Sequence, residues 1–138
     1  FLQKVDKKTD LLKFEILFQH IRQMHEAGIY HGALSPKNIL VTASPATLPT
    51  FYIIDMAQSI LFSKTITGTK FAWYDLLNIA RGLKFYCQHV DIPPLLAHYG
   101  FSEAKIEAFT QSLNRYNPSK HTRNYLRGEF LFRRLLGR

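Results

Sequence analysis

Apolar residues recur every three or four positions through residues 11–27, and this spacing predicts an amphipathic helix with one buried stripe. Thr9 and Asp10 stand just before the pattern and are residue types that cap helix N-termini. Gly28 follows it, and we expect Gly28 to end the helix because glycine accepts the left-handed conformation of a C-terminal cap. The stripe consists of Phe14, Leu17, Ile21 and Met24.

A two-stranded β-ribbon is predicted next. Residues 38–42 and 51–54 are short runs of strand-forming residues, and the proline-containing segment 43–50 between them indicates a hairpin loop. Asn38 enters the first strand and Asp55 leaves the second. A pairing that brings these two strand ends to one side places the two side chains near each other.

The second half of the chain is predicted to be mainly helical, after a third short strand at residues 59–62 and a polar loop at 63–70. The segment 71–87 is apolar on nearly every face, which is typical of a central, buried helix. Its apolar residues are Phe71, Trp73, Leu76, Leu77, Ile79, Ala80, Leu83 and Phe85. Further helices are predicted at residues 93–99, 102–116 and 122–136. The fold class is therefore α+β, mostly α-helical, with one small β-ribbon.

The composition is that of a globular domain, because 46% hydrophobic residues with 14% aromatic ones are too many for a disordered chain. No apolar run reaches the ~18 residues of a membrane span. The charged start of the chain does not resemble a signal peptide, and the missing initiator methionine leads us to expect an excised fragment. Cys87 is the single cysteine, which excludes an internal disulfide and fits a reducing compartment.

The net charge of +8 is uneven along the chain. Residues 115–138 hold seven Lys or Arg and one acid, Glu129. Such a segment favours a polyanionic partner, which is a nucleic acid, an anionic lipid or a phosphorylated glycan. A basic amphipathic helix at a membrane surface is one form of this hypothesis, and a helix face that is simply solvated is the alternative.

The candidate chemistry lies in the segment from His31 to Leu40 and in Asp55, which follows Asn38 by seventeen residues. Phosphoryl transfer needs metal ions at the phosphates and a group that positions the acceptor hydroxyl. Carboxylate and amide oxygens suit Mg²⁺, so Asn38 and Asp55 are predicted metal ligands, although each could be an ordinary polar residue at a strand end. Lys37 is predicted to reach a phosphate, with a solvated surface position as the alternative.

These residues resemble the protein-kinase pattern of H-x-D, four residues, N, and a downstream D-F-G. His31 matches the histidine, Asn38 the asparagine and Asp55 the metal-binding aspartate, whereas Ala33 occupies the position of the catalytic aspartate. His31 is interpreted as a packed scaffold residue beside this vacant base position. Asp75, inside the apolar helix, matches the buried aspartate that braces the catalytic loop in kinase folds.

The order of these elements most closely resembles the lipopolysaccharide kinases of the Kdo/WaaP type, over roughly residues 11–116. The resemblance implies a protein-kinase-like C-terminal lobe across residues 1–138, without the N-terminal nucleotide-binding lobe and with a basic tail at 117–138. It implies transfer of the γ-phosphoryl group of ATP, with Mg²⁺, to a sugar hydroxyl of lipopolysaccharide. Lys37 and Asn38 would be cofactor-binding. The implied location is bacterial and cytoplasmic, or peripheral on the inner membrane through the basic C-terminal helix, with no nucleic acid expected.

Only twenty residues separate Asp55 from Asp75, which suits a sugar or another small acceptor better than a peptide. Ala33 removes the group that would accept the acceptor proton, so the chain is predicted to be inactive as it stands. Two alternatives stay open: a pseudokinase that serves as a binding or scaffolding module, and a kinase-like phosphotransferase for another small molecule or a protein. The remaining histidines, His25 among them, show no metal-ligand grouping.

Overall fold

The computed structural model describes residues 7–42, 44 and 46–115 of the chain. This part is mostly helical with short antiparallel strands, which confirms the predicted α+β class. In chain order the elements are α1 (Lys7–Glu26), β1 (Ile29–Tyr30), the 3₁₀ turn η1 (Pro36–Asn38), β2 (Ile39–Val41), β3 (Phe51–Ile53), the 3₁₀ turn η2 (Met56–Gln58), β4 (Ile60–Leu61), α2 (Lys70–Tyr86), α3 (Ile92–Tyr99) and α4 (Glu103–Asn114).

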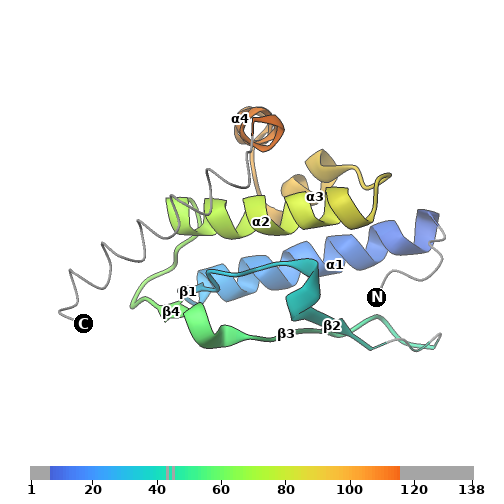
Figure 1. The fold of residues 1–138 in the computed structure, drawn as a ribbon, viewed down its shortest axis with the longest axis horizontal. Coiled ribbons are helices and arrows are strands. Elements are labelled where there is room, and N and C mark those ends of the chain that lie inside the picture. Colours follow the sequence, from blue (N-terminus) through green and yellow to red (C-terminus); the bar gives the residue numbers. More distant parts are fainter. Residues whose placement is uncertain (1–6, 43, 45, 116–138) are drawn as a thin grey trace.

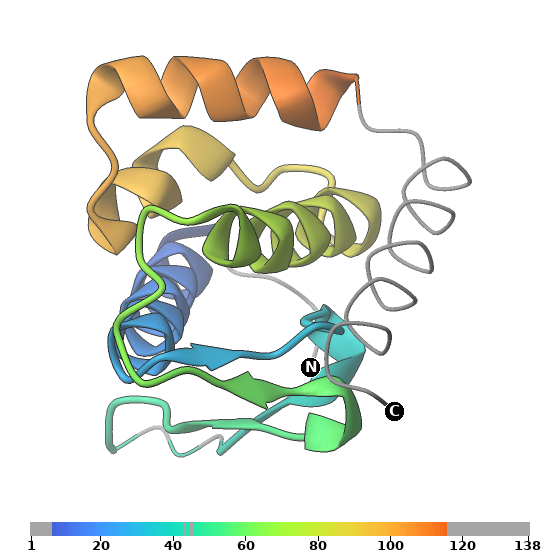
Figure 2. The same ribbon diagram turned by 90° about the vertical axis from the view of Figure 1, so that its left-hand side faces the viewer.

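The helices are stacked on one side of the molecule and the strands lie together on the other (Figures 1 and 2). Helix α3 contacts both α1 and α4, and α4 also contacts α2. Helix α2 contacts β1 and the turn η1, so it joins the helical layers to the loop that leads into the ribbon. The candidate site is therefore built where the helical side meets the strands.

The buried stripe of α1 is confirmed. Phe14, Leu17 and Ile21 are buried, and Met24 packs against the core from a partly buried position. The predicted N-terminal cap is wrong, because the helix begins at Lys7 and the residues expected to cap it lie within its first turn. Lysine is a good helix former, so the helical pattern extends upstream of the apolar stripe. The two residues concerned are Thr9 and Asp10.

Gly28 ends α1 as predicted. Its φ is +83°, a conformation that glycine adopts without steric cost. A Cβ at this position would lie 2.5 Å from the carbonyl oxygen of Phe62, so no other residue fits. The same stretch of chain is tied down by a hydrogen bond of 2.8 Å from the Phe62 N–H to the Gly28 carbonyl. Glycine thus both reverses the chain and permits the close approach of the strand region after it.

The predicted ribbon is also confirmed. β2 and β3 pair antiparallel, with Ile39 opposite Ile53 and Leu40 opposite Tyr52. The inward positions Ile39 and Phe51 join the core, whereas Leu40 and Tyr52 are exposed on the outer face, as the alternation of a strand requires. The third predicted strand is confirmed as β4, which pairs with β1. β1 has only two residues, too few to give a periodic pattern in the sequence.

Helix α2 is central and largely buried, as its apolar composition predicts. Phe85 is the exception, with 75% of its surface exposed. It follows the fully buried Leu83 by two positions, which is about 200° around a helix, so the two side chains point in nearly opposite directions. Expecting Phe85 to lie in the core was therefore wrong.

The last two described helices end and begin where the sequence predicts. Gly100 has a φ of +105° and closes α3. Ser102 caps α4, because its hydroxyl accepts a hydrogen bond of 3.4 Å from the N–H of Lys105. The predicted helix at 122–136 and the basic tail at 117–138 lie outside the described residues. None of the helices described here is long and apolar enough to cross a membrane.

Candidate functional site

The loop from His31 to Asn38 connects β1 to β2 and is held in place by α2. The buried carboxylate of Asp75 accepts two hydrogen bonds from the main chain of this loop. Its Oδ2 atom lies 2.8 Å from the His31 nitrogen, and its Oδ1 atom lies 3.0 Å from the Gly32 nitrogen. Hydrogen bonds to a charged acceptor are stronger than neutral ones, so this carboxylate fixes the start of the loop to the helix.

Two further buried residues complete the surroundings of Asp75. His25 on α1 places its Nε2 atom 3.1 Å from the Asp75 carboxylate and its Nδ1 atom 2.7 Å from the hydroxyl of Tyr99 on α3. Burial raises the pKa of the Tyr99 hydroxyl well above its usual range, so the hydroxyl stays protonated and donates to Nδ1. The Nε2–H group then donates to Asp75. Three helices thus meet at one hydrogen-bonded chain.

Sequence reasoning missed the roles of His25 and Tyr99. A signal was present for His25, because it follows Ile21 by four positions and therefore lies on the buried stripe of α1. A buried histidine needs a polar partner, and only the fold shows which residue provides it. Arg22 reinforces the same helix contact, since its guanidinium donates a hydrogen bond of 3.0 Å to the Tyr99 carbonyl and pairs with Glu26.

The imidazole of His31 links the loop to the strand end at Ile54. Its Nε2 atom lies 2.9 Å from the Ile54 carbonyl, to which it donates. The Ala33 N–H donates to its Nδ1 atom over 3.1 Å. One nitrogen donates and the other accepts, which defines a neutral imidazole in a fixed tautomer. The His31 carbonyl in turn accepts a hydrogen bond of 3.3 Å from the Ser59 hydroxyl.

Asn38 is brought to the same end of the ribbon as Asp55. The Asn38 carbonyl accepts a hydrogen bond of 2.9 Å from the N–H of Ile54, the residue directly before Asp55. The Asn38 side-chain amide donates a hydrogen bond of 2.9 Å to the Ala33 carbonyl. This bond fixes the orientation of the amide, so its oxygen is the atom left to act as an acceptor or ligand.

Asp55 has an unusual backbone conformation. With φ 63° and ψ 59° it lies in the left-handed region, and among the described residues no other non-glycine residue has a positive φ. The left-handed conformation costs an ordinary L-residue about 1–2 kcal/mol, somewhat less for aspartate. Such strain is concentrated at functional sites, where a side chain must be held in a particular direction. The carboxylate of Asp55 is exposed to solvent.

The donor set at this end of the ribbon fits a magnesium ion. Mg²⁺ is bound through hard oxygen atoms, and it keeps several waters while taking only one or two protein ligands. An exposed carboxylate at Asp55 and an amide oxygen at Asn38 match this requirement. Within residues 7–42, 44 and 46–115, no three His, Cys, Asp or Glu side chains come together. Lys37, next to Asn38 on η1, is exposed.

Ala33 lies in the middle of this arrangement and contributes only main-chain groups to it. Its N–H donates to the ring of His31, and its carbonyl accepts from the amide of Asn38. The methyl side chain is half-buried and has no atom that can bind a proton. The backbone of the loop is therefore held on both sides of a position that has no acid or base.

The braced loop and the oxygen donors beside it are what a kinase-like transferase requires, and the comparison with known families agrees. The sequence profile of the lipopolysaccharide kinase (Kdo/WaaP) family matches residues 3–112. This range includes every residue of the site described above. The chain belongs to the lipopolysaccharide kinase (Kdo/WaaP) family. No curated protein matches the chain closely enough to be a recognised relative.

Proposed function

We propose that this chain carries the catalytic-loop side of a sugar kinase, which transfers a phosphoryl group from ATP to a sugar hydroxyl of lipopolysaccharide. One observation carries the proposal: in a member of this family, the Ile54–Asn38 hydrogen bond joins the loop to the strand end that bears Asp55. The two oxygen-bearing side chains are thus available at one end of the ribbon. Phosphoryl transfer depends mainly on such positioning and on neutralising charge.

Each residue of the site has a defined part in the proposal. Asn38 and Asp55 would hold Mg²⁺, which when bound neutralises the charge of the phosphates. Lys37 would contribute a further positive charge near a phosphate oxygen. Asp75 and His31 are positioning residues: the first fixes the loop backbone, and the second ties the loop to Ile54.

Ala33 limits the activity of the chain as it stands. In a kinase loop with aspartate at this position, the carboxylate orients the acceptor hydroxyl and accepts its proton as the new P–O bond forms. A methyl group does neither. Since general base catalysis contributes about 10²–10⁴-fold, turnover by the Ala33 form is expected to be reduced by a factor of that order.

The test compares the full-length protein with its Ala33→Asp variant. Both are incubated with Mg²⁺, labelled ATP and detergent-dispersed lipopolysaccharide, and the label transferred to lipopolysaccharide is measured. We expect transfer by the Ala33→Asp variant at a rate about 10²–10⁴-fold above that of the parent. The double variant Ala33→Asp/Asp55→Asn should lose this gain. No transfer by a folded Ala33→Asp variant would overturn the proposal.

The same Ala33 favours a second candidate function, a pseudokinase that binds a partner without turnover. In that case the loop, its hydrogen bonds and the ribbon serve only as a scaffold. Binding of a protein partner that survives Asp55→Ala and does not depend on nucleotide would support the pseudokinase. Partner binding that requires Mg²⁺ and nucleotide would contradict it.

Association with a lipid surface belongs to the first candidate, because the sugar of lipopolysaccharide is presented by a membrane. The seven Lys or Arg of residues 115–138 support such an association through anionic lipid headgroups. Binding to anionic vesicles that falls as salt is raised is the expected behaviour. Equal binding to neutral vesicles would contradict this part of the proposal.

A further inference from the structure

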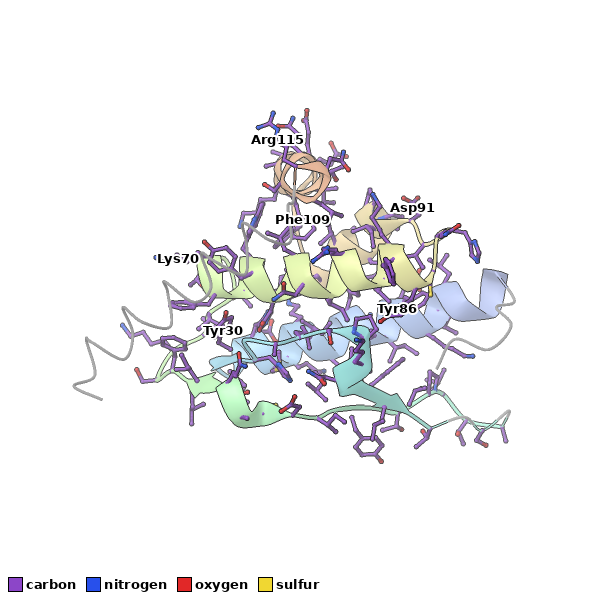
Figure 3. The ribbon with its side chains drawn as sticks, in the orientation of Figure 1. Tyr30, Lys70, Tyr86, Asp91, Phe109 and Arg115 are labelled. Carbon is purple, nitrogen blue, oxygen red and sulfur yellow. The ribbon has the colours of Figure 1, made fainter. Side chains whose placement is uncertain are left out.

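An open groove runs beside the candidate site, between the catalytic loop and the C-terminal half of α2. Its volume is about 380 Å³, which lies within the range of about 300–1,000 Å³ found for small-molecule sites. Ser35, Pro36 and Lys37 line it on the loop side. Helix α2 lines the other side, up to Tyr86 at its C-terminal end, which lies far along the helix from Lys70 at its start (Figure 3).

The floor of the groove is a close contact between helix and loop. Gly82 faces Pro36 so closely that a Cβ at position 82 would overlap the proline ring. The absence of a side chain therefore lets α2 approach η1 and brings Lys37 within the same groove as the side chains of the helix. Because the ring of Pro36 is attached to the backbone, this spacing is fixed by two rigid elements.

The charges along the groove favour an anion. Lys37 from the loop and Arg81 from α2 both line it, and both are exposed. None of the eight described lining residues is acidic. Ser35 and Asn78 add a hydroxyl group and an amide, which can both donate and accept hydrogen bonds. Arginine and lysine are the residues that most often contact phosphate and carboxylate groups.

Aromatic side chains complete the groove and indicate what carries the anionic group. Phe85 and Tyr86 are 75% and 43% exposed, although large apolar groups are normally withdrawn from solvent. Their rings are nearly perpendicular, at 89°, with centroids 5.0 Å apart. They therefore offer apolar ring surface in two directions. A sugar ring has apolar C–H faces edged by hydroxyl groups, so it can pack on an aromatic ring while its hydroxyls bond to polar neighbours.

We propose that this groove binds an anionic saccharide, a sugar that carries a phosphate or carboxylate group. Arg81 takes the anionic group, Lys37 adds positive charge on the loop side of the groove, and Phe85 and Tyr86 pack against the ring of the sugar. The inference rests on the proposed function and extends it, because Lys37 directly precedes Asn38. A saccharide beside Lys37 would be one residue along the chain from Asn38, a proposed metal ligand, and the groove would select the acceptor by its charge.

Binding to the full-length protein tests this groove directly, without ATP or Mg²⁺. The probes are glucose 6-phosphate, glucuronate, glucose and inorganic phosphate, titrated by saturation-transfer difference NMR. We expect glucose 6-phosphate or glucuronate to bind at least about tenfold more tightly than glucose and phosphate, since the groove contacts both parts of the ligand. Arg81→Gln and Phe85→Ser should each weaken that binding at least about tenfold, the loss of one good contact.

Lys84→Gln is the matched control, because it removes the same charge from an exposed position of α2 that does not line the groove. A loss of binding in Lys84→Gln equal to that in Arg81→Gln would overturn the proposal. Binding of inorganic phosphate as tight as that of glucose 6-phosphate and glucuronate would also overturn it. Thermal melting shows that each variant is folded.

The two proposals fail separately. If phosphoryl transfer by the Ala33→Asp form continues unchanged after Arg81→Gln, the acceptor binds elsewhere and only the groove is refuted. If glucose 6-phosphate or glucuronate binds in the groove but no transfer is ever seen, the sugar kinase is refuted and the binding site stands.

Discussion

Asp75 is the residue on which most of the site depends. It lies completely buried in α2 and accepts hydrogen bonds from the His31 and Gly32 main chain and from the ring of His25. A buried carboxylate without such partners would be strongly destabilising. The same bonds that make its burial tolerable also set the position of the loop.

Asp75→Asn is therefore expected to lower the free energy of unfolding by about 2–4 kcal/mol. The amide N–H₂ group of asparagine would face a main-chain N–H group that in the parent donates to a carboxylate oxygen. Urea denaturation measures the change. His98→Gln is the control: it removes the partly exposed pair with Glu15, and pairs near the surface contribute only about 0–1 kcal/mol. Equal losses in the two variants would show that Asp75 is not a brace.

Tyr99 makes the free energy of unfolding depend on pH in the alkaline range. Burial raises the pKa of its hydroxyl, so the folded state keeps the proton while the unfolded state loses it above about pH 10. The contribution of Tyr99 is complete below that pH and is lost as the pH rises. Between pH 9 and 11 this residue alone should reduce the free energy of unfolding by about 1.4 kcal/mol.

Tyr99→Phe tests this dependence. The variant is expected to be less stable at pH 7 by about 1–3 kcal/mol, because the Nδ1 atom of His25 loses its donor. Its stability should fall less between pH 9 and 11 than that of the parent, as followed by urea denaturation. Tyr52→Phe, at an exposed position of the ribbon, should leave the pH dependence unchanged. Identical slopes for Tyr99→Phe and the parent would contradict the prediction.

At the scale of elements, the contact between α2 and η1 depends on the absence of a side chain. Alanine is a better helix former than glycine by about 1 kcal/mol, so Gly82→Ala should stabilise an isolated helix. In the fold we expect the opposite, a loss of about 1–3 kcal/mol, because the new methyl group overlaps Pro36.

A double-mutant cycle isolates this effect. Pro36→Ala removes the ring atoms that the methyl group would meet, so Gly82→Ala should cost less in the Pro36→Ala background than in the parent. The free energies of unfolding of the four proteins give the coupling. Additive effects would mean that helix and loop do not touch as described.

The long elements could be predicted from the sequence because each shows a period or a terminal signal. The stripe of α1, its end at Gly28, the end of α3 at Tyr99 and the start of α4 at Glu103 are local features, and the structure has them at or within one residue of the predicted positions. The pairing of β1 with β4 could not be predicted, since two-residue strands have no period and their partners are far apart in the sequence. Phe85 shows a related limit, because its apolar character does not reveal whether any neighbouring element covers it.

At the scale of the whole molecule, the site combines segments that are far apart in the sequence. Contacts within one hairpin could be predicted, whereas contacts between separate helices could not. Asn38 and Asp55 could be proposed as neighbours because a hairpin brings its strand ends together. His25, Asp75 and Tyr99 come from three helices, and only their packing shows that they form one chain of hydrogen bonds. The groove between η1 and α2 was equally hidden, because it depends on a single glycine. The metal, nucleotide and lipopolysaccharide roles stay predictions.

The left-handed backbone of Asp55 bears on how this chain has changed over time. Replacement by glycine would relieve the strain. We expect the free energy of unfolding of Asp55→Gly, measured by urea denaturation, to exceed that of Asp55→Ala by about 1 kcal/mol. Random drift in a chain with no further use for the carboxylate would meet no resistance to such a change. Aspartate nevertheless stands there beside a loop whose base position is alanine. Under the proposed function, cation binding by this carboxylate offsets the backbone cost, whereas the methyl group of Ala33 offers nothing to the acceptor.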